Sequence, residues 1–152
     1  MTFPFAQENT ESRQRLDALV RGLSEADLAR ATHYGWTVSA LLAHLAFWDQ
    51  RMIVILKRWK EQGFDSSPID SAAVNDALKG ICHALEPRAA IELCLSSADA
   101  LDAELAALTP DLVKQIEEHI AATSTQFRMN RSLHRNDHLK DIEALIAQGK
   151  QR

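Results

Sequence analysis

Residues 36–49 read WTVSALLAHLAFWD, a strongly apolar run that decides the fold of this chain. Thr37 can cap a helix, and the apolar residues after it recur every three or four positions as far as about Gln62. A helix with so wide an apolar surface has to be buried among other helices. The run therefore predicts a helical core, and His44 within it is a basic ring whose burial needs a reason.

The same helical period covers most of the remaining sequence. It predicts four long helices, over about 9–23, 37–62, 71–108 (interrupted before Pro87) and 124–149. A short turn of helix is expected at 24–27, and residues 63–68 form the clearest linker. No run alternates with period two, so we expect no strand. The sequence predicts an all-α, four-helix bundle, with residues 1–152 as one domain.

Two further histidines lie four residues apart near the end of the chain. A spacing of four places His134 and His138 on one helix face, a turn apart. They continue the row through Phe127 and Ile142, so both are predicted to point into the bundle. With His44 they offer three nitrogen ligands from two helices and leave a coordination position for water or substrate. For any one of the three, a core histidine satisfied by hydrogen bonds is the alternative.

Composition and charge exclude several classes of protein. A net charge of −4 and a pI near 5.8 give no basic surface for binding nucleic acid. We see no signal peptide and no stretch approaching the roughly 18 apolar residues of a membrane span, so we expect a cytoplasmic protein that does not bind a membrane. Cys82 and Cys94 are too few for a disulfide framework and are expected to be reduced core thiols.

The motifs that carry the histidines resemble a known superfamily. Residues 36–49 resemble the second-helix signature of the DinB/YfiT-like metalloenzymes, and residues 130–142 are similar to the metal-ligand helix at the end of those proteins. The combination is most similar to the ClbS/DfsB branch, in which an asparagine precedes the first of two such histidines by four residues. Asn130 stands at that position before His134.

The resemblance implies a four-helix bundle that binds a divalent ion, zinc or nickel, through His44, His134 and His138. Activities known in the superfamily are thiol-dependent transferases and isomerases that use mycothiol or bacillithiol, and hydrolysis of a reactive electrophile by the ClbS branch. The sequence departs from the usual patterns in places. Mycothiol-dependent members tend to carry a carboxylate where His134 stands, many members carry glutamine where Asp141 stands, and an aromatic residue often occupies the position of Arg135.

Three polar residues are candidates for orienting the histidine rings by hydrogen bonds. Asn130 and Asp141 lie about one turn from a ligand on the same helix, and Asp49 lies just over one turn beyond His44. Asp49 could also act as a base. For each of the three, a plain solvated surface residue is the alternative.

We therefore expect a divalent-metal-dependent enzyme, a hydrolase or a thiol S-transferase, acting on a small electrophilic molecule. A low-molecular-weight thiol is the candidate co-substrate. One alternative is a helical module that sequesters a small molecule without turnover, and another is an interaction protein with vestigial histidines. The expected partner is a small-molecule substrate, with a homodimer left open.

Overall fold

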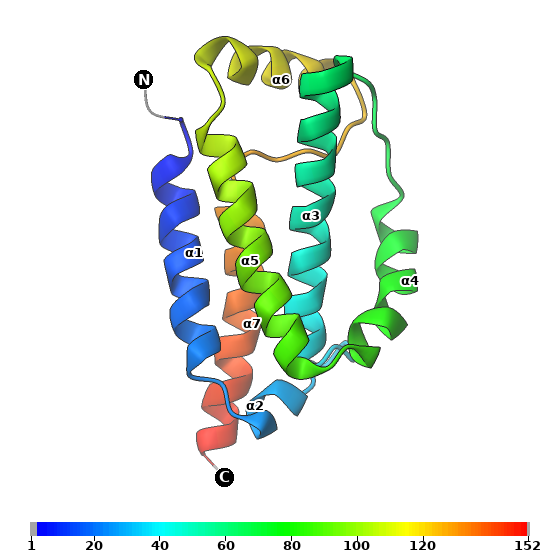
Figure 1. Ribbon diagram of the computed structural model, residues 1–152. Helices are drawn as coiled ribbons and strands as arrows, with labels where there is room; N and C mark the ends of the chain where they lie inside the picture. The colour runs from blue at the N-terminus through cyan, green and yellow to red at the C-terminus, as the bar shows by residue number, and fades with distance from the viewer. Residues whose placement is uncertain (1–2, 152) are drawn as a thin grey trace.

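The computed structural model describes residues 3–151, which form seven α-helices and no strand (Figure 1). In the bundle, α3 packs on α5, α5 on α1, α1 on α7 and α7 on α3, which closes a ring. The predicted all-α bundle is confirmed. Its four helices are α1 (Ala6–Arg21), α3 (Val38–Gln62), α5 (Pro87–Ala106) and α7 (Ser132–Lys150). The other three are α2 (Glu25–Ala29), α4 (Ser71–Ala84) and α6 (Pro110–Ala122).

The central helix is α3, as its apolar sequence predicts. The Thr37 hydroxyl accepts a hydrogen bond from the Ala40 N–H and caps its start, and Gly63 ends it with a φ of 85°. We expected no segment able to span a membrane, but α3 is long and apolar enough by length and composition. The most apolar part of α3 is 72% buried inside the bundle, which is the pattern of a core helix.

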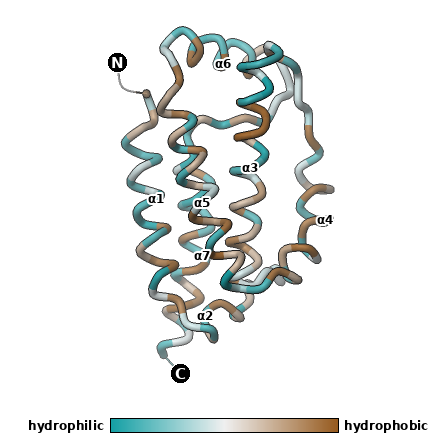
Figure 2. Tube along the Cα trace, in the orientation of Figure 1, coloured by the Kyte–Doolittle hydropathy of each residue, from teal (hydrophilic) through white to brown (hydrophobic). Residues whose placement is uncertain are grey.

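The core consists of two apolar clusters, one nearer each end of the bundle. Along α3, residues up to Ala46 belong to one cluster and residues from Met52 onward to the other. Asp49 lies between them and is only 2% exposed. Figure 2 shows apolar and polar residues interspersed along the four bundle helices. A buried polar layer therefore crosses the middle of the bundle.

Two parts of the predicted helix pattern are wrong. The proline that ends one helix also begins another, because Pro110 occupies the first turn of α6 and the Thr109 hydroxyl accepts from the Leu112 N–H. The last helix begins at Ser132 and not near residue 124. Residues 123–131 form an irregular segment after α6, the helix that lies across one end of the bundle (Figure 1). Phe127 is buried in this segment and not on a helix.

Candidate metal centre

The fold brings the three predicted ligands together. His44 comes from α3, while His134 and His138 come from successive turns of α7. The Nε2 atoms of His44 and His134 are 3.2 Å apart, and one nitrogen from each of the three rings lies within 4.8 Å of the others. The three ring centroids are separated by 4.9 to 5.3 Å. The spacing of four therefore places both rings on one face of α7, as the sequence predicted.

Aromatic side chains surround the deepest of the three rings. His44 is 6% exposed, and Trp36 meets its ring edge-on with centroids 5.4 Å apart. Trp48, one turn further along α3, lies 6.3 Å from the same ring. These indoles limit the access of water to His44.

Burial keeps the three imidazoles neutral. It lowers the pKa of His44 to about 4, helped by the charge of His138. It lowers the pKa of His134 to about 2, with the charge of Arg131 as the next cause. Burial also lowers the pKa of His138, although the charges of Asp141 and Asp137 oppose the shift. Neutral imidazole is the form that binds a metal ion, so all three rings have the protonation state that coordination requires near pH 7.

The donor set suits a divalent ion. Two nitrogens bound tetrahedrally at about 2.0–2.1 Å from one ion lie roughly 3.3 Å apart, and the two Nε2 atoms of His44 and His134 are 3.2 Å apart. The buried Nδ1 atoms of His44 and His138 have no hydrogen-bond partner among residues 3–151. A buried nitrogen without a partner is costly, so a water molecule or another ligand is expected beside these rings.

Arg131 contacts the ring of His134 at its Nδ1 atom. Its Nη2 lies 3.2 Å from His134 Nδ1. A guanidinium is always a donor, so this Nδ1 accepts and the proton of neutral His134 lies on Nε2, facing His44. Coordination of an ion through Nε2 would require that proton to move to Nδ1 and the Arg131 contact to be given up. Arg131 therefore competes with a ligand role of His134.

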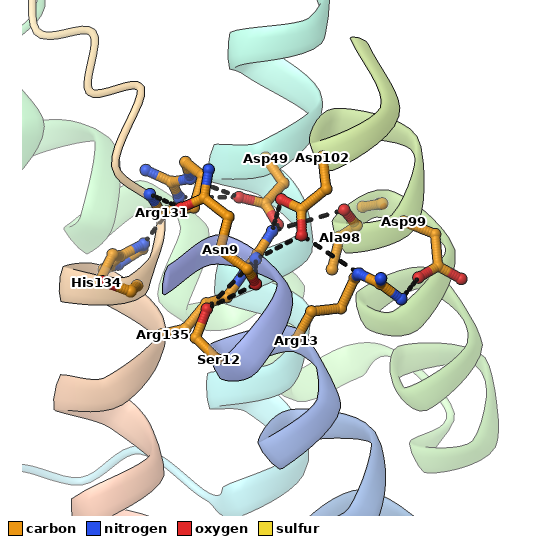
Figure 3. Close-up of polar contacts among 12 residues, drawn as sticks. Asn9, Ser12, Arg13, Asp49, Ala98, Asp99, Asp102, Arg131, His134 and Arg135 are labelled. Carbon is orange, nitrogen blue, oxygen red and sulfur yellow. Dashed lines mark hydrogen bonds and ion pairs between the residues drawn. The ribbon is translucent and has the colours of Figure 1, made fainter. Parts of the chain in front are cut away.

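Arg131 belongs to the buried polar layer (Figure 3). Its Nε and Nη2 both donate to Asp49 Oδ1, at 3.0 and 2.8 Å. Arg135, which is wholly buried, donates to both carboxylate oxygens of Asp102 and lies 3.6 Å from Asp49 Oδ2. Burial lowers the pKa of Arg131 against the opposing charge of Asp49. Burial also acts against charged Arg135, but its bonds to Asp102 raise the pKa overall.

A cavity of about 580 Å³ opens beside the histidines. Trp48 forms part of its wall and donates from Nε1 to Asn75 of α4. The two histidines at its floor are His44 and His134. The rest of the lining comes from Met52 of α3, from α4, α6 and α7, and from the segment before α7, and includes Ser71, Ile120, Thr125, Phe127, Arg128, Arg131 and Asp137. A small molecule in this cavity would reach the open side of the histidine cluster.

The three predicted orienting residues have different positions. Asn130 precedes α7, and its Oδ1 accepts from the N–H and hydroxyl of Ser132, so it shapes the helix start and forms no hydrogen bond with a histidine among residues 3–151. Asp141 accepts a hydrogen bond from the Tyr34 hydroxyl and acts on His138 only through its charge. Asp49 is buried and reaches the site through Arg131, so the solvated alternative is wrong for it.

Sequence reasoning missed the two arginines and Asp102. Arg135 was visible only as a departure from the superfamily pattern, at a position that is often aromatic. Its burial could have been read from the helix face, because position 135 follows a ligand on α7 and precedes the buried Leu139 by four residues. The partner carboxylate, Asp102, lies 33 residues away on α5 and carries no local signal.

Neither cysteine is a candidate nucleophile. Cys82 and Cys94 are both free and buried, as the sequence predicts. Burial raises the pKa of Cys94 to about 12, with Asp49 adding to the shift, and burial also raises the pKa of Cys82. Both thiols are therefore protonated and unreactive near pH 7.

The lowered histidine pKa values predict that acid destabilises the metal-free protein. Between pH 6.5 and the lowered pKa, the unfolded chain binds protons that the folded chain excludes, so stability falls as the pH falls. For His44, with a pKa of about 4, the loss between pH 7.5 and pH 5 is about 2 kcal/mol. Urea unfolding with a chelator present measures it. His44→Leu should show a shallower dependence, and a stability that is flat over this range would contradict the prediction.

Comparison with known proteins assigns the family. The model of the family described as mycothiol maleylpyruvate isomerase N-terminal domain matches residues 10–134. The match includes His44 and His134 and ends before His138. Comparison with curated proteins and with solved structures gave no match. With most of its length matched, the chain belongs to the mycothiol maleylpyruvate isomerase N-terminal domain family, within the DinB/YfiT-like superfamily.

Proposed function

We propose that this protein is a divalent-metal-dependent enzyme that acts on a small electrophilic molecule, with the ion held by His44, His134 and His138. The observation that carries the proposal is the convergence of three neutral imidazoles, two of which, His44 and His134, line a cavity. A structural zinc site normally has four protein ligands, whereas here the cluster has three and adjoins open space. The expected location of the enzyme is the cytoplasm.

The protein's own residues supply binding and orientation. The histidines leave one side of the cluster open, and the indoles of Trp36 and Trp48 limit access of water to it. When bound, a divalent ion supplies Lewis-acid chemistry that lowers the pKa of a water or thiol in its open position. Zinc and nickel both accept imidazole ligands, and the donor set favours neither over the other. Asp137, which lines the cavity one turn from His134, is available to accept a proton.

Two reaction classes fit the site. The family points to thiol-dependent chemistry, because its description names a mycothiol enzyme. The identity of one ligand points instead to hydrolysis. His134 is a histidine, as in the ClbS/DfsB branch, whereas mycothiol-dependent members tend to carry a carboxylate at this position. A sequestering module without turnover is the remaining candidate, favoured by the apolar wall that Trp48, Phe127 and Ile120 give the cavity.

Metal analysis of protein purified without a nickel column tests the proposal. We expect about one zinc or nickel ion per chain, removable by a chelator without loss of the helical circular-dichroism spectrum. An epoxide such as phenyl glycidyl ether then separates the reactions, because hydrolysis yields a diol and thiol addition yields a thioether. Metal-bound protein that produces neither would support sequestration. Protein that takes up no ion from either metal salt would overturn the proposal.

A further inference from the structure

One arginine of the cavity lining, Arg131, is held in place by hydrogen bonds to Asp49. Arg131 lines this cavity although its side chain is only 5% exposed. Its Nε and Nη2 donate hydrogen bonds to Asp49, and Nη2 also donates to His134. Its Nη1 makes no hydrogen bond to any residue between 3 and 151 and is not fully buried, so its N–H groups are left for the cavity.

The charges around the cavity favour an anion. Arg131 and Arg128 line it, and Asp137 is the only carboxylate in the described lining. Asp49 lies outside the lining and is shared between Arg131 and Arg135, so it compensates each guanidinium only in part. The cavity is therefore positive, although the whole chain carries a net charge of −4. This local charge favours the binding of an anion in the cavity.

The side chain of Arg131 is less mobile than that of an arginine free in solvent. Two hydrogen bonds to Asp49 hold the guanidinium plane, so binding an anion costs little side-chain entropy. A planar guanidinium with free N–H groups matches a carboxylate better than an ammonium does. The lining also includes the apolar side chains of Trp48, Phe127 and Ile120, which suit the apolar body of a small organic acid.

We propose that Arg131 forms an anion-binding subsite next to the histidine cluster, and that the substrate is a small organic molecule bearing a carboxylate or a similar oxyanion. This inference rests on the proposed function for its meaning as a substrate site. Asp49 is then a positioning residue, because it holds Arg131 and touches no ligand. Arg131 fixes the charged end of the molecule in the cavity that His44 and His134 also line.

Benzoate and benzamide test the subsite in metal-free protein, because they share one shape and differ in charge. With chelator present, titration followed by protein NMR should give a benzoate affinity at least about tenfold above that of benzamide, a difference of about 1.4 kcal/mol. The shifts in wild-type protein should include the Arg131 Nε–H and the Trp48 indole N–H. Equal affinities, or shifts confined to other surfaces, would overturn the proposal.

Variants separate Arg131 from the general charge of the cavity. Arg131→Gln should lower benzoate affinity about tenfold and leave benzamide binding unchanged. Arg128→Gln, at an exposed position of the same lining, is the matched control and should change benzoate affinity less than about threefold. If Arg131→Gln does not fold, the wild-type shifts alone decide. If the protein binds benzoate at Arg131 but takes up no metal, the proposed enzyme is refuted and the subsite stands. If it takes up metal but does not bind benzoate at Arg131, the subsite is refuted and the proposed enzyme stands.

Discussion

Replacing His134 by alanine is expected to abolish tight divalent-metal binding and to leave a folded helical protein. The substitution removes one of three ligands, and two imidazoles from different helices hold an ion much more weakly, by at least about 100-fold. Folding depends instead on the apolar clusters at both ends of the bundle. Loss of the ring also removes a buried polar group with an unfavourable charged form, so the cost in stability is small.

The measurement is metal content by mass spectrometry beside a thermal melt, for protein stripped and reloaded with one metal salt. The matched control is His33→Ala, at an exposed position that lies outside the cluster. The control should retain about one ion per chain and an unchanged melting temperature. A His134→Ala protein that keeps a full equivalent of metal would show that the ligands are misassigned. Unfolding on chelation would show that the ion is structural.

Arg135→Ala is expected to destabilise the bundle by about 3–5 kcal/mol, the usual cost of breaking a buried ion pair. Arg135 is 0% exposed and makes five hydrogen bonds, to Asn9, Ser12, Ala98 and both oxygens of Asp102. Its loss leaves the Asp102 carboxylate, 11% exposed, with only a weaker partner. It also opens a void in a layer that α1, α5 and α7 share.

Two comparisons identify the cause of that effect. Arg13→Ala removes the other partner of Asp102, but its side chain is 33% exposed, so we expect a loss of about 1 kcal/mol or less. The double variant Arg135→Met with Asp102→Leu removes the charge together with its partner and should be more stable than Arg135→Ala alone. Urea unfolding curves measure all three. A loss below about 1 kcal/mol for Arg135→Ala would contradict the assigned role of the ion network.

The sequence predicted the helices and the pairing of His134 with His138 because both depend on local spacing. His44, in contrast, lies 90 residues from His134 and was joined to them by its place in an apolar helix and by the family resemblance. The period of α3 and the interval between His134 and His138 are repeats of three or four residues, which a helix converts directly into a face. The start of α7 was misplaced by the same reasoning. Phe127 precedes His134 by seven residues and fits the helical row, but it is buried by an irregular segment. An apolar residue is buried in the same way on the inner face of a helix and in an irregular segment, so the expected burial of Phe127 did not show which of the two it occupies.

The ion network could not be predicted because its partners lie far apart in the sequence. Arg131 and Asp49 are 82 residues apart, and Arg135 bonds to residues as distant as Asn9. Arginine and aspartate are usually exposed, so the ordinary expectation for Asp102 is a solvated helix face. The short α6 was missed because Pro110 was read only as the end of the preceding helix.

The weak attachment of α4 has a consequence for how such a protein changes during evolution. Among its contacts with other helices, α4 packs mainly on α3, and Cys82 is its one fully buried residue. Yet Ser71 and Asn75 of this helix line the cavity. Substitutions in α4 can therefore reshape the cavity while the bundle and its histidines stay intact. A lineage could acquire new substrates by mutating this helix, at little risk to folding.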